Sequence, residues 1–231
     1  MTSAVTIVVP VLNEIDVLAD VQSHISDGDF EQIIIVDGGS TDGSWEWLQE
    51  HWHDGQQYLA MQAPAGRARQ MNAGAKVAKG DVLVFLHADS HLPDNAKQLV
   101  SSIEHGPYWW GRFNVRFSSQ FWLMRMIAWF MNQRSKLTAI ATGDQAMFMR
   151  RIAYDQVGGF DQIALMEDIA MSQKLKKLSR PLCISKTVLT SARRWEENGV
   201  GRTVLSMWAL RLAYFFGVSP DRLAQLYKHI R

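Results

Sequence analysis

Val82-Leu83-Val84-Phe85-Leu86 is an uninterrupted apolar run that passes directly into His87-Ala88-Asp89, with Pro93 close behind. A continuous apolar run of this length is typical of a parallel strand that is buried on both faces. Open α/β sheets bind ligands where such strands end, so we expect Asp89 to face a ligand crevice. Its carboxylate suits Mg²⁺ or Mn²⁺, which take one or two protein carboxylates and complete their shell with substrate phosphates. A turn with a solvated Asp is the alternative reading.

Strand-like and helix-like segments alternate through the first hundred residues around this run. Apolar runs predict strands at 5–11, 33–36, 58–61 and 82–86. Helical periodicity and end signals predict helices at 14–25, 44–52 and 66–78 and another after Pro93. Strands alternating with helices of this length imply an α/β fold, in which a mostly parallel sheet with right-handed crossovers is covered by helices on both faces.

The second half of the chain predicts a mixed sheet. Residues 109–117 alternate between apolar and polar side chains, which predicts a half-exposed strand antiparallel to the others. A strand at 145–149, a helix at 167–178, a strand at 186–191 and two final helices follow. The segment 121–131 is apolar all round apart from Arg125, so we expect a helix that is either buried or lying against lipid.

Composition and charge bound the function classes. A chain of 231 residues with 47% hydrophobic content can bury one sizeable core. Lys and Arg total 24 against 23 Asp and Glu, a net charge of +1, so no nucleic acid partner is expected. The single Cys183 excludes an internal disulfide framework and fits a reducing compartment, so we expect a cytoplasmic location. The N-terminus lacks a signal pattern, and no segment reaches the roughly 18 apolar residues of a membrane span.

A glycine-rich loop, Asp37-Gly38-Gly39-Ser40-Thr41-Asp42, follows the second strand. Glycines let the backbone approach a ligand closely, and Asp37 can accept from a ribose hydroxyl or a base N–H, so we expect a nucleotide here. Capping of the next helix by Ser40, Thr41 or Asp42 explains part of the pattern without a ligand. Neither a P-loop lysine motif nor a dinucleotide Gly-x-Gly-x-x-Gly is present, which argues against an NTPase or a dehydrogenase.

Charged residues also stand at two helix starts. Arg67 and Arg69 lie in the first turn of the helix at 66–78, where the helix dipole disfavours cations. A nucleotide or an ordinary surface ion pair would compensate them. Glu167-Asp168 opens a later helix, where the dipole stabilises acids without any ligand. A turn at 158–161 would let this helix start fold over the ligand edge, where one carboxylate could act as general base toward an acceptor hydroxyl.

The segment Arg193-Arg194-Trp195 places two guanidinium groups beside an aromatic ring. Arginine forks match phosphate oxygens and aromatic faces stack on sugars or bases, so this cluster suits a leaving diphosphate. A solvated face or a contact with anionic lipid are the alternatives, because Arg202 and Arg211 follow nearby.

Taken in order, these motifs resemble the family-two glycosyltransferases of the GT-A fold. Residues 9–14 resemble the family's opening strand and turn, residues 36–42 its nucleotide loop, and His87-Ala88-Asp89 its metal-binding DxD motif in a His-started form. Glu167-Asp168 resembles its ED motif, in which the Asp is the catalytic base. The likeness covers nearly the whole chain. The strings at 86–90, 143–145, 191–195 and 218–222 resemble a bacterial subgroup named for arsenosugar biosynthesis.

The resemblance implies an inverting, metal-dependent transfer of a sugar from a nucleotide diphosphate donor to a hydroxyl acceptor. It implies one catalytic domain at 1–195, with a nucleotide half at 1–105 and an acceptor half at 106–195, and a helical appendage at 196–231. Asp168, beside Glu167, would be the base, and Asp89 would hold Mg²⁺ or Mn²⁺. The residues expected at the donor nucleotide are Pro10, Asn13, Glu14, Asp37, Gly38, Gly39, Asp42, Arg67, Arg69 and His87. Those expected at the diphosphate or the acceptor are Asp144, Gln145, Arg193, Arg194 and Trp195.

Two departures from the family pattern refine these expectations. His87 replaces the first Asp of DxD, so metal binding would rest mainly on Asp89. Ser191 stands where processive members have the Gln of QxxRW, so a single transfer is expected. Two alternatives stay open: a nucleotidyltransferase of related sheet architecture, and a non-catalytic protein that binds a nucleotide sugar or a membrane. Peripheral contact with the inner membrane face, through residues 121–131 and 208–216, is compatible with either activity or binding.

Overall fold

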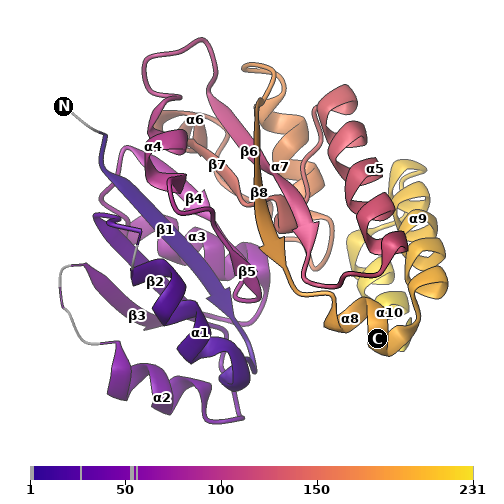
Figure 1. The fold of residues 1–231 in the computed structure, drawn as a ribbon, viewed down its shortest axis with the longest axis horizontal. Helices are drawn as coiled ribbons and strands as arrows, with labels where there is room; N and C mark the ends of the chain where they lie inside the picture. Colours follow the sequence, from indigo (N-terminus) through magenta and orange to yellow (C-terminus); the bar gives the residue numbers. More distant parts are fainter. Residues whose placement is uncertain (1–2, 27, 53–54, 56, 231) are drawn as a thin grey trace.

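The computed structural model describes residues 3–26, 28–52, 55 and 57–230, apart from the side chains at 26, 194, 197, 198 and 228–230. Its strands are β1 (Val5–Val11), β2 (Gln32–Asp37), β3 (Tyr58–Gln62), β4 (Val82–Phe85), β5 (Ser90–His91), β6 (Trp110–Phe117), β7 (Met147–Arg150) and β8 (Leu182–Thr190). They form one sheet in the order β3-β2-β1-β4-β7-β6-β8-β5, with helices on both faces (Figure 1). The expected α/β fold with a mixed, mostly parallel sheet is confirmed.

The helices follow the strands much as the periodicity predicts. In chain order they are α1 (Ile15–Ser26), α2 (Ser44–His51), α3 (Arg67–Val77), α4 (Ala96–Ser101), α5 (Trp122–Thr138), the 3₁₀ helix η1 (Gly143–Gln145), α6 (Arg151–Gln156), α7 (Glu167–Leu175), α8 (Arg193–Asn198), α9 (Val200–Phe215) and α10 (Pro220–Ile230). Three helices therefore end the described chain, where two were expected. None of the helices in the described ranges combines the length and the apolar character needed to cross a bilayer.

Alternate residues of the first strands build two cores, one on each face of the sheet. Ile7 and Ile33 pack with α1 and α2 on one face, whereas Val8 and Ile34 pack with α3 on the other. Because both faces are covered, β1 and β2 are continuous apolar runs with almost no exposed side chain. β1 pairs in parallel with both β2 and β4, which brings the carboxyl ends of all three strands to one edge.

The direction of β6 differs from the expectation. β6 pairs antiparallel with β7, and β7 pairs antiparallel with β4, so β6 runs in the same direction as β4 and β7 is the reversed strand. β6 is also mostly buried, although half of it was expected to be exposed. Even Arg112 lies inside the protein, where it donates to the backbone oxygen of Asn132 at 3.1 Å. Arg112 and Asn114 hydrogen-bond to each other inside the protein, whereas Arg116 is exposed, and a period-of-two pattern does not distinguish these cases.

α5 is amphipathic and longer than the expected helix. Met124, Ile127 and Ala128 are buried and pack with residues of β6, whereas Trp129 and Phe130 are each 56% exposed. One face of α5 is therefore buried against the sheet, and the other face is exposed. Figure 1 shows α5 and α9 at one end of the molecule, far from α2 and β3.

The chain beyond β4 forms a short strand that sequence periodicity does not indicate. β5 pairs antiparallel with the end of β8, where the Ser90 hydroxyl donates to Thr190 Oγ1 at 3.0 Å. The backbone N–H of Ser191 donates to the carbonyl oxygen of Asp89 at 3.1 Å. The turn that carries Asp89 is thereby joined to the segment that opens α8.

Candidate active site

Asp89 lies at the carboxyl edge of the sheet, between the end of β4 and β5, and its side chain is half-buried. The Ser90 hydroxyl oxygen lies 3.3 Å from Asp89 Oδ1 and shares its single proton between this carboxylate and Thr190 Oγ1. Arg193 lies on α8, which the Asp89 backbone adjoins through Ser191, and its Nη2 is 3.8 Å from Glu14 Oε2. Residues that follow β1, β4 and β8 thus meet at this edge, as the parallel topology requires.

A chain of contacts connects the end of β4 with the start of α7. The Asp144 carboxylate is 3.3 Å from Nδ1 of the half-buried His87. A Cβ at Gly143 would lie 2.2 Å from His87 Nε2, so only glycine allows this close approach. The Gly143 N–H donates to Asp168 Oδ2 at 3.0 Å. His87, two residues before Asp89, is therefore linked to Asp168 through η1, and Gly143, which was not among the expected site residues, makes the link.

The environment of Asp168 suits a general base. Burial raises its pKa to about 6, and the neighbouring charges of Glu167 and Asp144 act in the same direction. The N–H groups of Gly143 and Ile169 donate to the two carboxylate oxygens and limit this rise. A base with a pKa near the operating pH is ionised for much of the time and still accepts a proton strongly. Glu167 is buried beside it.

The glycine-rich loop is held by its own hydrogen bonds. Asp37 is fully buried, and its Oδ2 accepts from the N–H of Gly39 at 2.9 Å and from Gln62 Nε2 at 3.2 Å. The carboxylate therefore shapes the loop in which it was expected to meet a ribose or base. The N-cap of α2 is Gly43 and not Ser40, Thr41 or Asp42. Asp42 still satisfies the first N–H of the helix, because its Oδ1 accepts from Ser44 N–H at 3.0 Å while its Oδ2 accepts from Ile15 N–H at 3.1 Å.

The turn after β1 is fastened to this loop. Asn13 has a φ of 55°, and its Oδ1 accepts from the N–H of Thr41 at 2.8 Å. Gly38 donates its N–H to the Val11 oxygen at 2.8 Å, and Pro10 is half-buried in β1. These contacts place the two expected nucleotide-binding segments side by side at the carboxyl ends of β1 and β2.

The expected arginines take different positions. Arg67 and Arg69 are exposed in the first turn of α3, and no ion pair within the described ranges includes either of them. They remain available to an anionic ligand. Arg193 is exposed on α8, and the side chain of Arg194 lies outside the described residues.

Trp195 and Gln145 make contacts within the protein. The Trp195 ring meets Phe117 edge to face, with centroids 5.4 Å apart. Gln145 is fully buried, and its Oε1 accepts from Thr142 N–H at 3.2 Å within η1. Both were expected to contact diphosphate or acceptor. The structure instead places Gln145 beneath the turn that carries Gly143 and Asp144.

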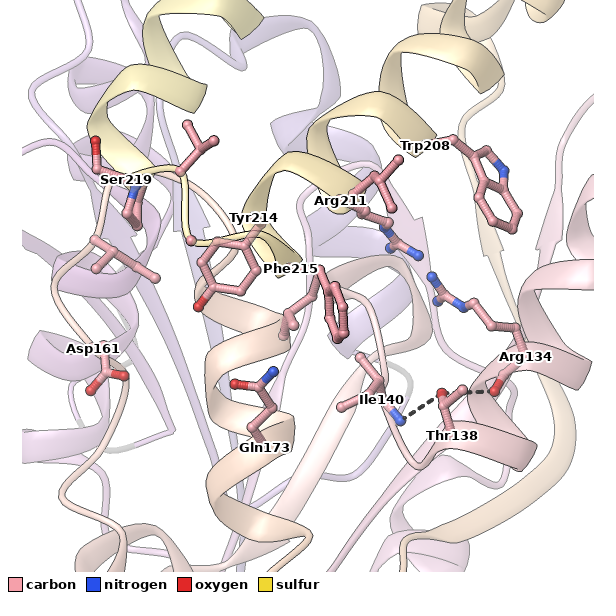
Figure 2. Close-up of a pocket in the computed structure, with 16 residues that line it drawn as sticks. Arg134, Thr138, Ile140, Asp161, Gln173, Trp208, Arg211, Tyr214, Phe215 and Ser219 are labelled. Carbon is pink, nitrogen blue, oxygen red and sulfur yellow. Dashed lines mark hydrogen bonds between the residues drawn. The ribbon is translucent and has the colours of Figure 1, made fainter.

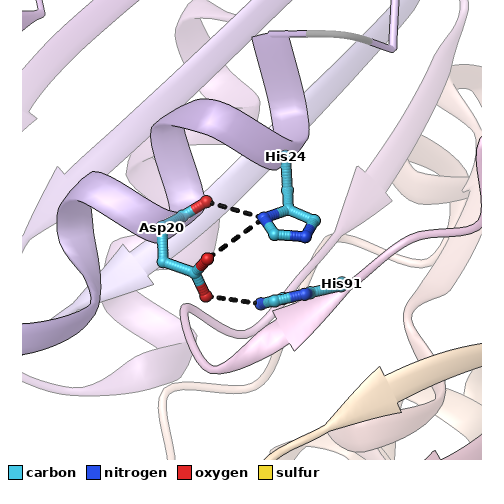
Figure 3. A group of neighbouring side chains, drawn as sticks. All are labelled: Asp20, His24 and His91. Atoms are coloured by element: carbon cyan, nitrogen blue, oxygen red, sulfur yellow. Dashed lines mark hydrogen bonds and ion pairs between the residues drawn. The ribbon is translucent and has the colours of Figure 1, made fainter.

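Metal binding at Asp89 fits the chemistry of its side chain. A lone carboxylate supplies hard oxygen ligands, and Mg²⁺ or Mn²⁺ commonly binds one such group together with substrate phosphates. Of the described residues, a separate set brings three ligand atoms within 4.8 Å: Asp20, His24 and His91. Figure 3 shows Asp20 beside the two neighbouring rings, with its Oδ2 2.8 Å from His91 Nε2. These nitrogen-rich ligands suit a transition metal better than Mg²⁺.

A pocket of about 830 Å³ lies beside α7, between α5, α9 and the start of α10 (Figure 2). Ile169, which follows the candidate base, lines it together with Arg134 and Tyr214. These residues were not expected at the site. A continued helical pattern through residue 138 is the signal that would have placed Arg134 on the same helix as Met124 and Ile127.

Comparisons with known proteins identify the family and the fold. The model of glycosyl transferase family 2 matches residues 6–158. That match ends before Glu167-Asp168, so the assignment of the base rests on the geometry described above. No curated protein matches the sequence.

Solved structures share the fold at low identity. The mannosyltransferase PcManGT from Pyrobaculum calidifontis, in complex with GDP-Man and Mn²⁺, is 18% identical with a TM-score of 0.66, over 100% of this chain and 70% of that one. TarS 1–349 from S. aureus is 16% identical with a TM-score of 0.64, over 87% of this chain and 64% of that one. The same fragment in complex with UDP gives a TM-score of 0.64. The chain thus spans less than two thirds of the TarS fragment.

The family match extends over most of the chain and includes the opening turn, the glycine-rich loop and the segment with Asp89. It decides against both the nucleotidyltransferase and the non-catalytic alternative. The chain belongs to glycosyl transferase family 2 and is a glycosyltransferase of the GT-A fold.

Proposed function

We propose that this glycosyltransferase moves a sugar from a nucleotide diphosphate donor to a hydroxyl acceptor with inversion at the anomeric carbon. The observation that carries the proposal is the link from His87 through Gly143 to Asp168, with the pKa of Asp168 near 6. This link supports a role for Asp168 as the base beside the sheet edge that carries Asp89.

In the proposed reaction, the acceptor oxygen attacks the anomeric carbon from the side opposite the diphosphate. The bond from that carbon to the diphosphate oxygen breaks, and its electron pair leaves with the nucleotide. Asp168 takes the proton of the acceptor hydroxyl, so no enzyme nucleophile is required. Arg67 and Arg69 would bind the anionic donor. Mg²⁺ or Mn²⁺ held by Asp89 would offset the charge that develops on the leaving diphosphate.

A peripheral membrane contact forms a second part of the proposal. Exposed aromatic side chains gather on α5 and α9, with Trp122 65% and Phe215 81% exposed. Aromatic residues flanked by arginines, here Arg125 and Arg202, are suited to an anionic lipid surface. A single transfer is proposed, since Ser191 occupies the position of the processive Gln. The likeness to the subgroup named for arsenosugar biosynthesis stays a proposal.

The experiment is a thermal-shift panel of UDP-, GDP- and dTDP-sugars with and without Mn²⁺, because a ligand that binds the native state raises the apparent stability. We expect one nucleotide class to raise the Tm, and more so with Mn²⁺. NMR of the product formed from that donor should show the opposite anomer. Retention of configuration would contradict the mechanism, and no shift with any donor would contradict the proposed substrate class.

A further inference from the structure

The pocket beside α7 is suited to the apolar portion of a ligand. Its volume of about 830 Å³ falls within the range of small-molecule sites. The lining is mostly aliphatic and aromatic and includes Ile140, Ile163, Trp208, Leu212 and Phe215. Figure 2 shows Trp208 and Phe215 beside the open space between α9 and α5. A ligand with an apolar or aromatic portion would bury that portion here.

Arg134 lines the same pocket with buried hydrogen-bond donors that lack an acceptor. Its Nε and Nη2 atoms are shielded from solvent, yet neither has a hydrogen-bond partner among the described residues. Burial is the main cause that lowers the pKa of this guanidinium. A buried donor without a partner costs free energy, which a ligand oxygen would recover.

A second arginine faces the first. In Figure 2 the Arg211 guanidinium points toward that of Arg134 across the pocket. No ion pair in the described part of the chain includes either arginine. The carboxylate of Asp161 also lines the pocket, but it is paired with Lys174 Nζ at 2.7 Å. The two arginine charges are therefore left for an anionic group.

The pocket adjoins the candidate base. Ile169 lines it and is the next residue after Asp168. The charge of Asp168 acts to raise the pKa of Arg134, against the effect of burial. Tyr214, another lining residue, has a raised pKa through burial first and then through the charges of Asp161 and Asp168. A molecule in this pocket would lie within electrostatic reach of the proton-accepting carboxylate.

We propose that this pocket binds the acceptor, and that the acceptor is an amphiphile with an anionic oxygen group such as a phosphate. Arg134 and Arg211 bind the anionic group through charge-assisted hydrogen bonds, and Trp208 and Phe215 contact the apolar part. The pocket is continuous with the aromatic side chains of α9, which offer such a molecule an apolar approach. This assignment of the acceptor class rests on the proposed function.

The test uses octyl phosphate, below its micelle concentration, as the probe in calorimetric titrations of the full chain. Octyl glucoside carries the same tail without charge, and inorganic phosphate carries the charge without a tail. We expect octyl phosphate to bind about 10-fold to 100-fold more tightly than either comparator, because it alone satisfies both parts of the pocket.

Variants separate the pocket from the rest of the surface. Arg134→Met and Arg211→Met should each weaken octyl phosphate about 10-fold or more, since each removes a charged donor. Arg116→Met, at an exposed arginine of β6 that does not line the pocket, should bind like the wild type. Phe215→Ser, at a side chain 81% exposed, should fold normally and lose much of the preference over inorganic phosphate.

Three results would overturn the proposal: equal binding of inorganic phosphate, equal binding of octyl glucoside, or unchanged affinity in folded Arg134→Met and Arg211→Met. Donor-induced Tm shifts, measured on the same variants, keep the two hypotheses apart. If donors bind while the affinity for octyl phosphate is the same in the wild type and both arginine variants, the acceptor class is wrong and the transferase assignment stands. If octyl phosphate shows the expected pattern and no nucleotide sugar binds, the site is real and the proposed donor chemistry fails.

Discussion

The backbone N–H of Gly143 donates a hydrogen bond of 3.0 Å to Oδ2 of Asp168, although the two residues are 25 positions apart in the sequence. The α-carbon of the same glycine faces the His87 ring so closely that no side chain fits between them. The position of the base therefore depends on the end of β4. A change at this contact should affect catalysis without touching either acidic motif.

Gly143→Ala should lower kcat by about 100-fold, because the added Cβ would displace the His87 ring or move the amide away from Asp168. Steady-state kinetics with saturating donor would measure this. The matched control is Gly201→Ala, since a Cβ at Gly201 meets no atom within 4 Å. Full activity in Gly143→Ala would show that η1 does not position the base.

The rate of transfer should depend on pH through Asp168. A base works in its ionised form, so kcat should rise by about tenfold per unit at acid pH and level off above about pH 6. A profile that is flat from pH 5 to 7, recorded with a donor and acceptor that do not titrate there, would contradict this assignment.

The same shift predicts a dependence of stability on pH. Because the pKa in the folded protein is about 6, above the value of about 3.9 in the unfolded chain, the folded state holds this proton more tightly. The stabilising contribution is complete below about pH 4 and is lost as the pH rises through about 6. Asp168→Asn should remove it. Urea unfolding of both proteins at several pH values would measure the free energy of unfolding against pH. The same pH dependence in the wild type and in Asp168→Asn would contradict the prediction.

Asp89→Ala should abolish the activation of transfer by Mn²⁺. Its carboxylate is the proposed protein ligand, whereas the Asp20, His24 and His91 cluster is a separate set. His24→Gln serves as the control and should keep the wild-type response to Mn²⁺. Titration of activity with MnCl₂ distinguishes the two sites. An Asp89→Ala protein that is still activated would place the ligand elsewhere.

The aromatic side chains of α5 should bind anionic membranes. A double variant, Trp122→Glu with Phe130→Glu, should lose co-sedimentation with vesicles of phosphatidylcholine and phosphatidylglycerol, because charges replace the inserted rings. Ile152→Glu is the matched control, since Ile152 on α6 is 62% exposed, close to the 65% of Trp122. Equal loss in the control, or no binding by the wild type, would rule out a specific membrane face.

The first half of the fold could be predicted because its strands are buried on both faces. Uninterrupted apolar runs such as β2 and β4 have few alternative structures, and the polar residues that follow them must lie at one edge. Asp89 and the loop after Asp37 could be located from this rule alone. The direction of β6 could not, because alternation reports which face a side chain takes and carries no information about strand polarity.

Long-range polar contacts account for most of what sequence reasoning missed. Arg112 on β6 is buried, and the backbone oxygen of Asn132 on α5 accepts from it. Gln145 was expected at a ligand, yet its amide holds η1. Arg134 is one of three cations on the amphipathic helix α5, and its place in the pocket depends on α9, which comes from a distant part of the chain. Such partners are set by tertiary packing, and local pattern does not contain them.

The most direct test of the account is a comparison of wild type and Asp168→Asn in single-turnover transfer, with donor affinity measured on the same proteins. A neutral amide keeps the shape but accepts no proton, so the rate should fall by about 10²-fold to 10⁴-fold while donor affinity stays within a factor of about two. Asp155→Asn, an exposed acid on α6, should match the wild type in both measurements. Transfer by Asp168→Asn at the wild-type rate would show that another group removes the proton.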